Sequence, residues 1–392
     1  IEEMYELADA DENALAKQQM EQAGLMRWMT VRFSANLPVM QVCSMFRSLP
    51  EVAWADAVGK IELHADPNDA FFANQWYLRN SGQTAGRVGA DINVSPAWNF
   101  TTGSSDVIVA VHDGGVQLSH PDLQSNMWQG KSFNFVANNT QLTDDNHGTH
   151  VAGLLAAVRN NAAGIAGVAG GNGTASTGVK MMSLQIIGGT PVVAGHEALS
   201  FVYAANNGAA ISQNSWSYNA ANFFPQYTAD AIDYFIANGG GTVLKGGIVI
   251  FSAGNNGTEQ TYFPPAYNKV LAVAAATHND EKAGYSNFGT WVDITAPGGD
   301  ASQPMLSTIT GSNYGNLFGT SMACPLVSGA AALLVSRAPG KMLADDLRSL
   351  LQFGVDNIYP INTANLFGKL GTGRLNVGKS MLRTDSLANN AT

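Results

Sequence analysis

The stretch DVIVAVHDGGV, residues 106–116, joins an unbroken apolar run to an aspartate and two glycines. A short continuous apolar run bounded by turn residues is typical of a strand that is buried on both faces of a sheet. Glycine tolerates the backbone angles of a tight turn, so the chain can reverse direction at Gly114 and Gly115. We therefore expect the carboxylate of Asp113 at the carboxyl end of a central strand.

Similar apolar runs recur at 179–187, 247–251 and 270–276. Between them, residues 196–207 carry apolar side chains at helical spacing, and Gly208 follows. Strands of this kind alternating with helices predict an α/β fold: a doubly wound, mostly parallel sheet with helices on both faces. In such sheets the ligand site forms at the carboxyl ends of the strands.

The composition restricts the class of protein. The chain has 392 residues, of which 45% are hydrophobic and 13% charged, and its net charge is −10. The acidic balance and the lack of any Lys/Arg-rich stretch argue against a nucleic-acid partner. Two cysteines, Cys43 and Cys324, do not imply a disulfide framework, and no apolar run is long enough to predict a membrane span.

Residues 1–63 have a pattern of their own. A helix capped by Asp11, a strand at 29–33, a second helix ending before Pro50 and a strand at 52–63 predict a small α+β domain. The rest of the chain is divided into a turn-rich connector, the main domain and a tail, at 64–83, 84–382 and 383–392.

Two further motifs supply partners for Asp113. DDNHGTHVAGLLAAV places His147 at the start of a predicted helix, and GTSMACPLVSGAAALLV places Ser321 at the start of another. A histidine can remove the serine proton, and an aspartate can orient the imidazole and stabilise its protonated form. The amino end of the serine's helix offers N–H groups and a partial positive charge to a developing oxyanion.

Asn255, in the glycine-flanked turn FSAGNNG after the strand at 247–251, is a candidate second donor to that oxyanion. Each of these residues has a structural alternative: Ser321 as a helix cap, and Asp113 and Asn255 as turn residues. His147 and His150 could also form a metal pair, but no third ligand motif accompanies them.

The order Asp, His, Asn, Ser in these four settings resembles the subtilisin-like serine proteases, the subtilases of peptidase S8 type. HPDL (120–123), QNSWSYN (213–219), YSNFGTWVDITAPG (285–298) and GTGRLNV (371–377) are also similar to family motifs. The resemblance covers residues 67–382 and implies a serine endopeptidase that acts through an acyl-enzyme on polypeptides. It assigns Asp113, His147 and Ser321 to the catalytic triad and Asn255 to the oxyanion hole.

Three positions depart from the family pattern. Gly114 replaces the usual Ser or Thr, His112 replaces an apolar residue, and Leu326 replaces a histidine. The first departure motivates an alternative function, a catalytically silent or permanently self-inhibited binding protein on the same fold. An esterase of the α/β-hydrolase type is disfavoured because no G-x-S-x-G occurs, and a zinc protease because HEALS (196–200) lacks a second histidine.

The resemblance further implies that residues 1–63 are a propeptide, which inhibits the protease and assists its folding. The protein is then expected to be an exported zymogen, with any signal peptide lying upstream of IEEMYELADA (1–10), which is not one. Processing is expected near residues 63–67.

Thermitase-like features suggest a structural calcium ion as the cofactor, because AAVRNNAAGIAG (156–167) resembles a calcium loop. The implied ligands are the side chains of Asp69, Asp122 and Asn161 and the carbonyls of Val158, Ala163 and Ile165; an ion-free, Asn-rich turn is the alternative. The family comparison also suggests that substrate lies along Ser215, Trp216 and Ser217, with Tyr262 at the floor of a shallow pocket.

Overall fold

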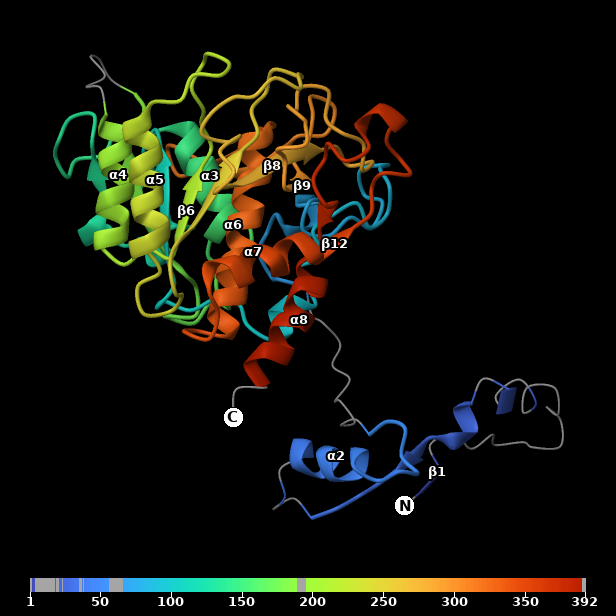
Figure 1. Ribbon diagram of the computed structural model, residues 1–392. Helices are drawn as coiled ribbons and strands as arrows, with labels where there is room; N and C mark the ends of the chain where they lie inside the picture. The colour runs from blue at the N-terminus through green and yellow to red at the C-terminus, as the bar shows by residue number, and fades with distance from the viewer. Residues whose placement is uncertain are drawn as a thin grey trace. The chain divides into compact units, whose positions relative to one another are not determined.

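The computed structural model describes residues 2–3, 18, 21–22, 24–34, 37, 39–55, 66–188 and 195–389. The chain divides into two compact units, Ile1–Leu63 and His64–Thr392. Figure 1 shows the secondary structure of each unit.

The amino-terminal unit contains a two-stranded antiparallel sheet and one well-defined helix. Strand β1 (Glu2–Glu3) pairs with β2 (Met29–Thr30), and α2 (Val39–Arg47) ends before Pro50 as predicted. The predicted strand at 52–63 is absent over 52–55, and the rest of it lies outside the described residues. Most of the helix expected after Asp11 lies outside them too.

The second unit is built on a nine-stranded sheet with the order β12-β13-β9-β8-β7-β6-β3-β5-β4. All neighbours pair in parallel except β12 and β13. The predicted mostly parallel α/β fold is therefore confirmed. The strands are β3 (Ile108–Asp113), β4 (Phe133–Asn134), β5 (Lys180–Gln185), β6 (Ile211–Asn214), β7 (Ile248–Ser252), β8 (Leu271–Ala276), β9 (Ile294–Pro297), β12 (Val355–Asp356) and β13 (Arg374–Leu375).

Helices cover both faces of this sheet (Figure 1). They are α3 (Asn146–Ala156), α4 (His196–Asn206), α5 (Gln226–Asn238), α6 (Thr320–Arg337), α7 (Ala344–Phe353) and α8 (Val377–Asn389). A separate hairpin joins β10 (Met305–Ile309) to β11 (Asn313–Leu317). Short 3-10 turns are η1 (Leu25–Arg27), η2 (Phe72–Asn74), η3 (Ala97–Asn99), η4 (Gln124–Asn126), η5 (Gln129–Lys131) and η6 (Ala364–Leu366).

Strand β3 shows how the two layers arise. Its side chains alternate between the faces of the sheet, as the pleat requires. Val109 and Val111 belong to the core cluster that contains α3 and α6, whereas Ala110 belongs to the cluster that contains α4 and α5. Because both faces are buried, the strand reads as a continuous apolar run rather than an alternating one.

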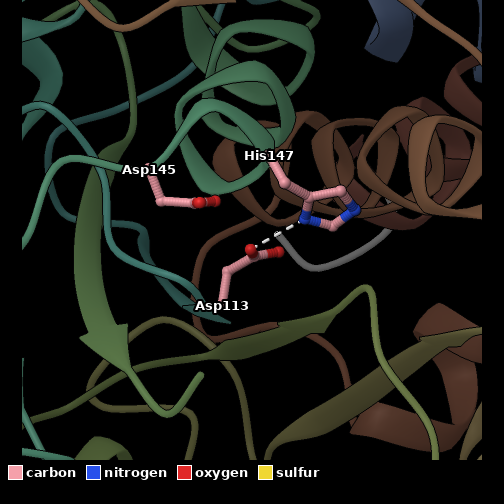
Figure 2. Close-up of side chains that lie close together, drawn as sticks. All are labelled: Asp113, Asp145 and His147. Carbon is pink, nitrogen blue, oxygen red and sulfur yellow. Dashed lines mark hydrogen bonds and ion pairs between the residues drawn. The ribbon is translucent and has the colours of Figure 1, made fainter. Parts of the chain in front are cut away.

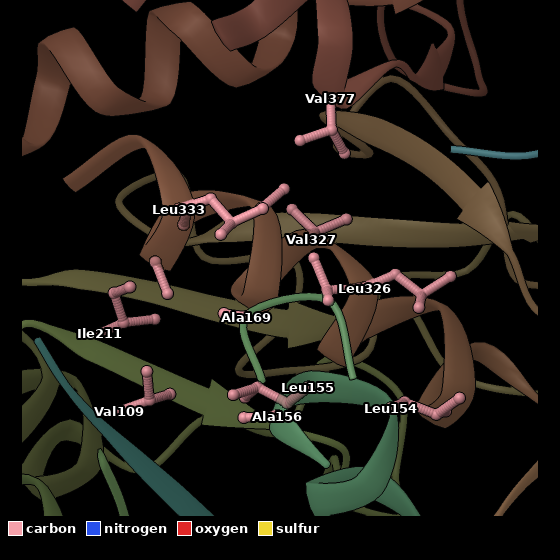
Figure 3. Packing of buried hydrophobic residues seen from close by; sticks show 14 of the residues in the cluster. Val109, Leu154, Leu155, Ala156, Ala169, Ile211, Leu326, Val327, Leu333 and Val377 are labelled. Atoms are coloured by element: carbon pink, nitrogen blue, oxygen red, sulfur yellow. The ribbon is translucent and has the colours of Figure 1, made fainter. Parts of the chain in front are cut away.

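Helix α6 lies at the centre of the first core. Figure 3 shows Leu326, Val327 and Leu333 packed among side chains from α3 and the sheet. Among the described residues, α6 is the one helix long and apolar enough to cross a membrane, but 89% of its apolar window is buried inside the protein. The apolar composition of α6 is explained by its burial in the core.

Candidate active site

Asp113 and His147 are joined by a hydrogen bond. Asp113 is the last residue of β3, and its Oδ1 accepts from His147 Nδ1 at 2.8 Å and from the Gly114 N–H at 2.7 Å (Figure 2). The Asp113 carboxylate is 2% exposed. Its negative charge raises the pKa of His147 to about 8, against the opposing effect of burial. The pair is therefore arranged to hold a proton on the imidazole.

Ser321 is brought to the same edge of the sheet by β6. Strand β6 pairs with β3, with His112 opposite Asn214, so the chain leaves both strands at the same edge. Ser215 follows directly after β6 and makes two hydrogen bonds with Ser321. Its hydroxyl donates to the Ser321 carbonyl at 2.9 Å, and its own carbonyl accepts from the Ser321 hydroxyl at 3.4 Å.

Pro325 explains the first of these bonds. In an α-helix the Ser321 carbonyl would accept from the N–H of the residue four positions later, which is Pro325 and has no N–H. The Ser215 hydroxyl satisfies the carbonyl instead. A proline early in α6 thus ties the serine to the strand that precedes Trp216.

The Ser321 hydroxyl is not bonded to the imidazole in this structure. No hydrogen bond between Ser321 and His147 occurs among the described residues, and the hydroxyl's contact with Ser215 is long. Since Nδ1 faces Asp113, Nε2 lies on the opposite side of the ring (Figure 2). Nucleophile–base hydrogen bonds are often long in enzymes without substrate and shorten when substrate binds.

Asn255 is held beside the start of α6. Its Oδ1 accepts from the Thr320 N–H at 2.9 Å and from the Thr320 hydroxyl at 2.8 Å, and its side chain is exposed. Because the oxygen is engaged by two donors, the Nδ2 group is left to donate elsewhere. The turn that carries it is fixed by Asn287, which is fully buried and accepts from the Asn256 N–H at 2.9 Å.

Residues 104–369 match the Subtilase family, Peptidase S8. The chain belongs to the subtilase family. It is 35% identical to the thermophilic serine proteinase of Bacillus sp. (strain AK1) over 307 residues, covering 78% of this chain and 68% of that protein. It is 33% identical to thermitase from Thermoactinomyces vulgaris over 316 residues, covering 80% and 99% of the two chains.

A protease from Pseudoalteromonas arctica has a similar structure, with a TM-score of 0.67 and 28% sequence identity. The match covers 82% of this chain and 100% of that one. Together with the family match, these similarities show that the protein is a subtilisin-like serine endopeptidase.

The departure at Gly114 has a structural counterpart in this subtilase. Asp113 Oδ2 is buried and has no hydrogen-bond partner among the described residues. A Cβ added at Gly114 would lie 2.6 Å from Cγ of Asp145, the residue that caps α3. The sequence did not single out Asp145, although a carboxylate one position before a helix is a recognisable cap signal.

The other two departures lie away from the predicted triad. His112 points to the opposite face of the sheet, where it stacks on Phe201 and its Nδ1 lies 2.7 Å from the Ser200 hydroxyl. Burial lowers the pKa of His112 to about 3, so the ring is neutral. Leu326 is fully buried in the core around α6.

The predicted substrate residues lie along one segment and a neighbouring loop. Trp216 and Ser217 are half-buried, and the Tyr218 N–H that follows donates to the Phe263 carbonyl at 2.9 Å. This bond brings the half-buried Tyr262 close to the segment that begins at Ser215. The indole of Trp216 packs edge-on against Phe251, with ring centroids 5.2 Å apart.

The structure brings together Asp69, Asp122 and the predicted calcium loop. Asp69 Oδ2 accepts from the Asn160 N–H at 2.9 Å, and Asp122 Oδ2 accepts from the Ile165 N–H at 2.9 Å. Both carboxyl groups are buried, at 5% and 1% exposure. Burial, together with the nearby charge of Asp69, raises the pKa of Asp122 to about 6.

Asn161 is close to Asp122 but presents its nitrogen. Its Nδ2 donates to Asp122 Oδ1 at 2.7 Å, and its Oδ1 accepts from the Ala163 N–H at 2.9 Å. Turning the amide over would exchange these two atoms. No described residue donates a hydrogen bond to the predicted carbonyl ligands Val158, Ala163 and Ile165.

The alternative histidine metal pair does not form. His150 Nε2 lies 3.0 Å from the Met305 carbonyl, and burial lowers the pKa of His150 to about 3. A different group, Asp113, Asp145 and His147, has potential metal-ligand atoms within 4.8 Å of one another. In that group Nδ1 of His147 is already engaged by Asp113, as the predicted triad requires.

Proposed function

We propose that Ser321 is the nucleophile of this endopeptidase, with His147 as its base and Asp113 as the group that orients His147. Ser321 attacks the scissile carbonyl and transfers its proton to His147 Nε2, which then gives that proton to the leaving amine. Water repeats the sequence on the acyl-enzyme. The observation that carries the proposal is the 2.8 Å bond from His147 Nδ1 to Asp113 Oδ1, at the same sheet edge as Ser321.

Asn255 and the backbone N–H at the start of α6 would hold the oxyanion. The support is the double contact of Asn255 Oδ1 with Thr320, which turns Nδ2 away from Thr320. The first N–H groups of a helix have no partner within the helix and add a partial positive charge at this place.

Substitution of the triad tests the assignment. We expect Ser321→Ala and His147→Ala to lower kcat by several orders of magnitude, roughly 10⁴-fold or more. Ser336→Ala is the matched control because Ser336 lies at the far end of the same helix and its hydroxyl donates to the Ala332 carbonyl. Retained hydrolysis in Ser321→Ala would contradict the proposal and favour a different nucleophile.

We further propose that residues 1–63 inhibit the protease and assist its folding, and that the protein is exported as a zymogen. The support is that these residues form a compact unit separate from His64–Thr392. A fluorophosphonate should label Ser321 more rapidly after controlled removal of residues 1–63. Equal slow labelling before and after removal would instead favour the catalytically silent alternative.

Calcium is the proposed structural cofactor. Its ligands would be Asp69 and Asp122 with Asn161 and the carbonyls of Val158, Ala163 and Ile165, an all-oxygen set of the kind calcium prefers. Two features fit a cation. Asp69 Oδ1 is buried without a partner among the described residues, and Asn160 and Ala162 adopt left-handed backbone angles (φ 60° and 63°) that are uncommon outside glycine. Such an ion would offset the repulsion between the two buried carboxylates.

For substrate, we propose an extended peptide along Ser215, Trp216 and Ser217 and a shallow pocket floored by Tyr262. The support is the Tyr218–Phe263 hydrogen bond, which brings the two segments together. Profiling with a peptide library should show small or medium residues before the cleaved bond. A preference for large aromatic residues there would contradict the role of Tyr262.

A further inference from the structure

Asp145 lies beside the proposed triad and has no part in the mechanism above. It is the amino-terminal cap of α3, and its Oδ1 accepts from the Gly148 N–H at 3.0 Å. Figure 2 shows its carboxylate pointing toward His147, from a different element than Asp113. A carboxylate oxygen of Asp145, a carboxylate oxygen of Asp113 and a ring nitrogen of His147 all lie within 4.8 Å of one another.

We propose that Asp145 is a second positioning carboxylate for His147, occupying the space that Gly114 leaves open and stabilising the imidazolium formed during catalysis. This inference rests on the proposed triad. It assigns to Asp145 an electrostatic role beyond capping α3.

Gly114 leaves the space that the Asp145 carboxylate occupies. A Cβ at that position would meet Asp145 Cγ at 2.6 Å and Oδ1 at 2.7 Å, closer than van der Waals contact allows. The hydroxyl residue usual at this position therefore cannot coexist with Asp145 where it now lies. The observed position of the Asp145 carboxylate thus requires a residue without a Cβ at position 114.

Two carboxylates act on the His147 ring. Asp113 faces it from β3 and Asp145 from the start of α3, and both carboxylates raise its pKa. Two buried titratable groups nearby, His150 and Cys324, are uncharged. Burial lowers the pKa of His150 to about 3, and burial raises that of the Cys324 thiol to about 12. Asp145 is half-buried, so its field at the ring is only partly screened by water.

The test separates charge from capping with Asp145→Asn, since asparagine caps a helix as well as aspartate but carries no charge. NMR titration of the His147 ring in the full chain with Ser321→Ala, assigned by difference with His147→Gln, measures the effect without activity. We expect the midpoint to fall from about 8 toward the ordinary histidine range. An unchanged midpoint would overturn the proposal.

The pH dependence of kcat/KM provides a second measurement, made on the active chain. The acidic limb of kcat/KM should move to lower pH in Asp145→Asn, so that the fraction of plateau rate retained at pH 6 rises about threefold. A purely structural cap would lower the rate without moving this limb, and that result would overturn the inference. Should Asp145→Asn misfold, Asp145→Ser is a second uncharged cap.

A double substitution tests the shared space. Gly114→Ser should destabilise the chain, and Asp145→Gly should remove most of that loss because the colliding carboxylate is gone. Additive losses in thermal melts would overturn the coupling of the two positions. Failure of the triad itself is distinguishable, since His147→Ala would then retain activity while the NMR titration still reports on Asp145.

Discussion

Thr320 anchors Asn255, and replacing Thr320 with valine removes that anchor while keeping its shape. Thr320 is fully buried. Its hydroxyl donates to Asn255 Oδ1 at 2.8 Å and accepts from the Gly254 N–H at 3.1 Å. In Thr320→Val both bonds are lost, and Asn255 keeps only the Thr320 N–H, at 2.9 Å.

The magnitudes follow from these contacts. A hydrogen bond between neutral groups contributes about 0.5–1.5 kcal/mol, and leaving the Gly254 N–H unpaired costs about 1–3 kcal/mol. We therefore expect the free energy of unfolding to fall by about 2–4 kcal/mol. Complete loss of an oxyanion donor lowers kcat by about 10²–10³-fold, a range that comes from subtilisin, a relative of this protein. Partial loss of orientation should lower kcat by about 3–10-fold.

The assay is steady-state hydrolysis of a peptide substrate, with kcat and KM measured separately and thermal melts alongside. Thr320→Ser keeps the hydroxyl and should retain kcat. In an Asn255→Ala background, Thr320→Val should cause little further loss, because its effect passes through Asn255. An equal loss of kcat in both backgrounds, or a rise in KM alone, would show that Thr320 does not act by orienting Asn255.

Three further predictions concern stability, each measured by thermal or denaturant unfolding in a Ser321→Ala chain to prevent self-digestion. Calcium at about a hundredfold excess over its Kd should raise the free energy of unfolding by about 2.7 kcal/mol, and magnesium should raise it much less. Asp122→Asn should lose most of the gain from calcium. An unshifted melting temperature would contradict the proposed calcium site. The folded pKa of His147 is raised to about 8, so the stability from its contact with Asp113 should be complete below the unfolded pKa of about 6.5 and disappear as pH rises through 8. His147→Gln should therefore destabilise the chain more at pH 6 than at pH 9. A pH-independent difference would count against the ion pair. Gly153→Ala should cost about 1–3 kcal/mol, since its Cβ would meet the hydroxyls of Ser307 and Thr308 at 2.3 Å, whereas Gly284→Ala, with nothing within 4 Å, should be nearly neutral.

The sheet was predictable because its strands are buried on both faces. The apolar runs at 107–111, 179–187, 247–251 and 270–276 correspond to β3, β5, β7 and β8, and the helix predicted at 196–207 corresponds to α4. Burial of this kind leaves a continuous apolar signal in the sequence. The hairpin of β10 and β11 leaves a weaker one, because β11 reads NYGNL and none of its residues is fully buried.

Parts of the site depend on contacts that local patterns do not encode. Asp113 and Ser321 stand at ends of predicted elements, so their placement at one edge followed from topology. The roles of Thr320 and Asp145 depend on contacts with Asn255 and Gly114, from segments distant in the chain. At 52–63 the apolar pattern predicted a strand that the structure lacks over residues 52–55.

The proposed mechanism requires the imidazole that Asp113 holds to activate the Ser321 hydroxyl. Peptide mapping after fluorophosphonate treatment tests it most directly, on the chain with residues 1–63 removed. We expect a single labelled peptide carrying the adduct on Ser321, and loss of that adduct in His147→Ala. An adduct on another serine, or undiminished labelling of Ser321 without His147, would contradict it.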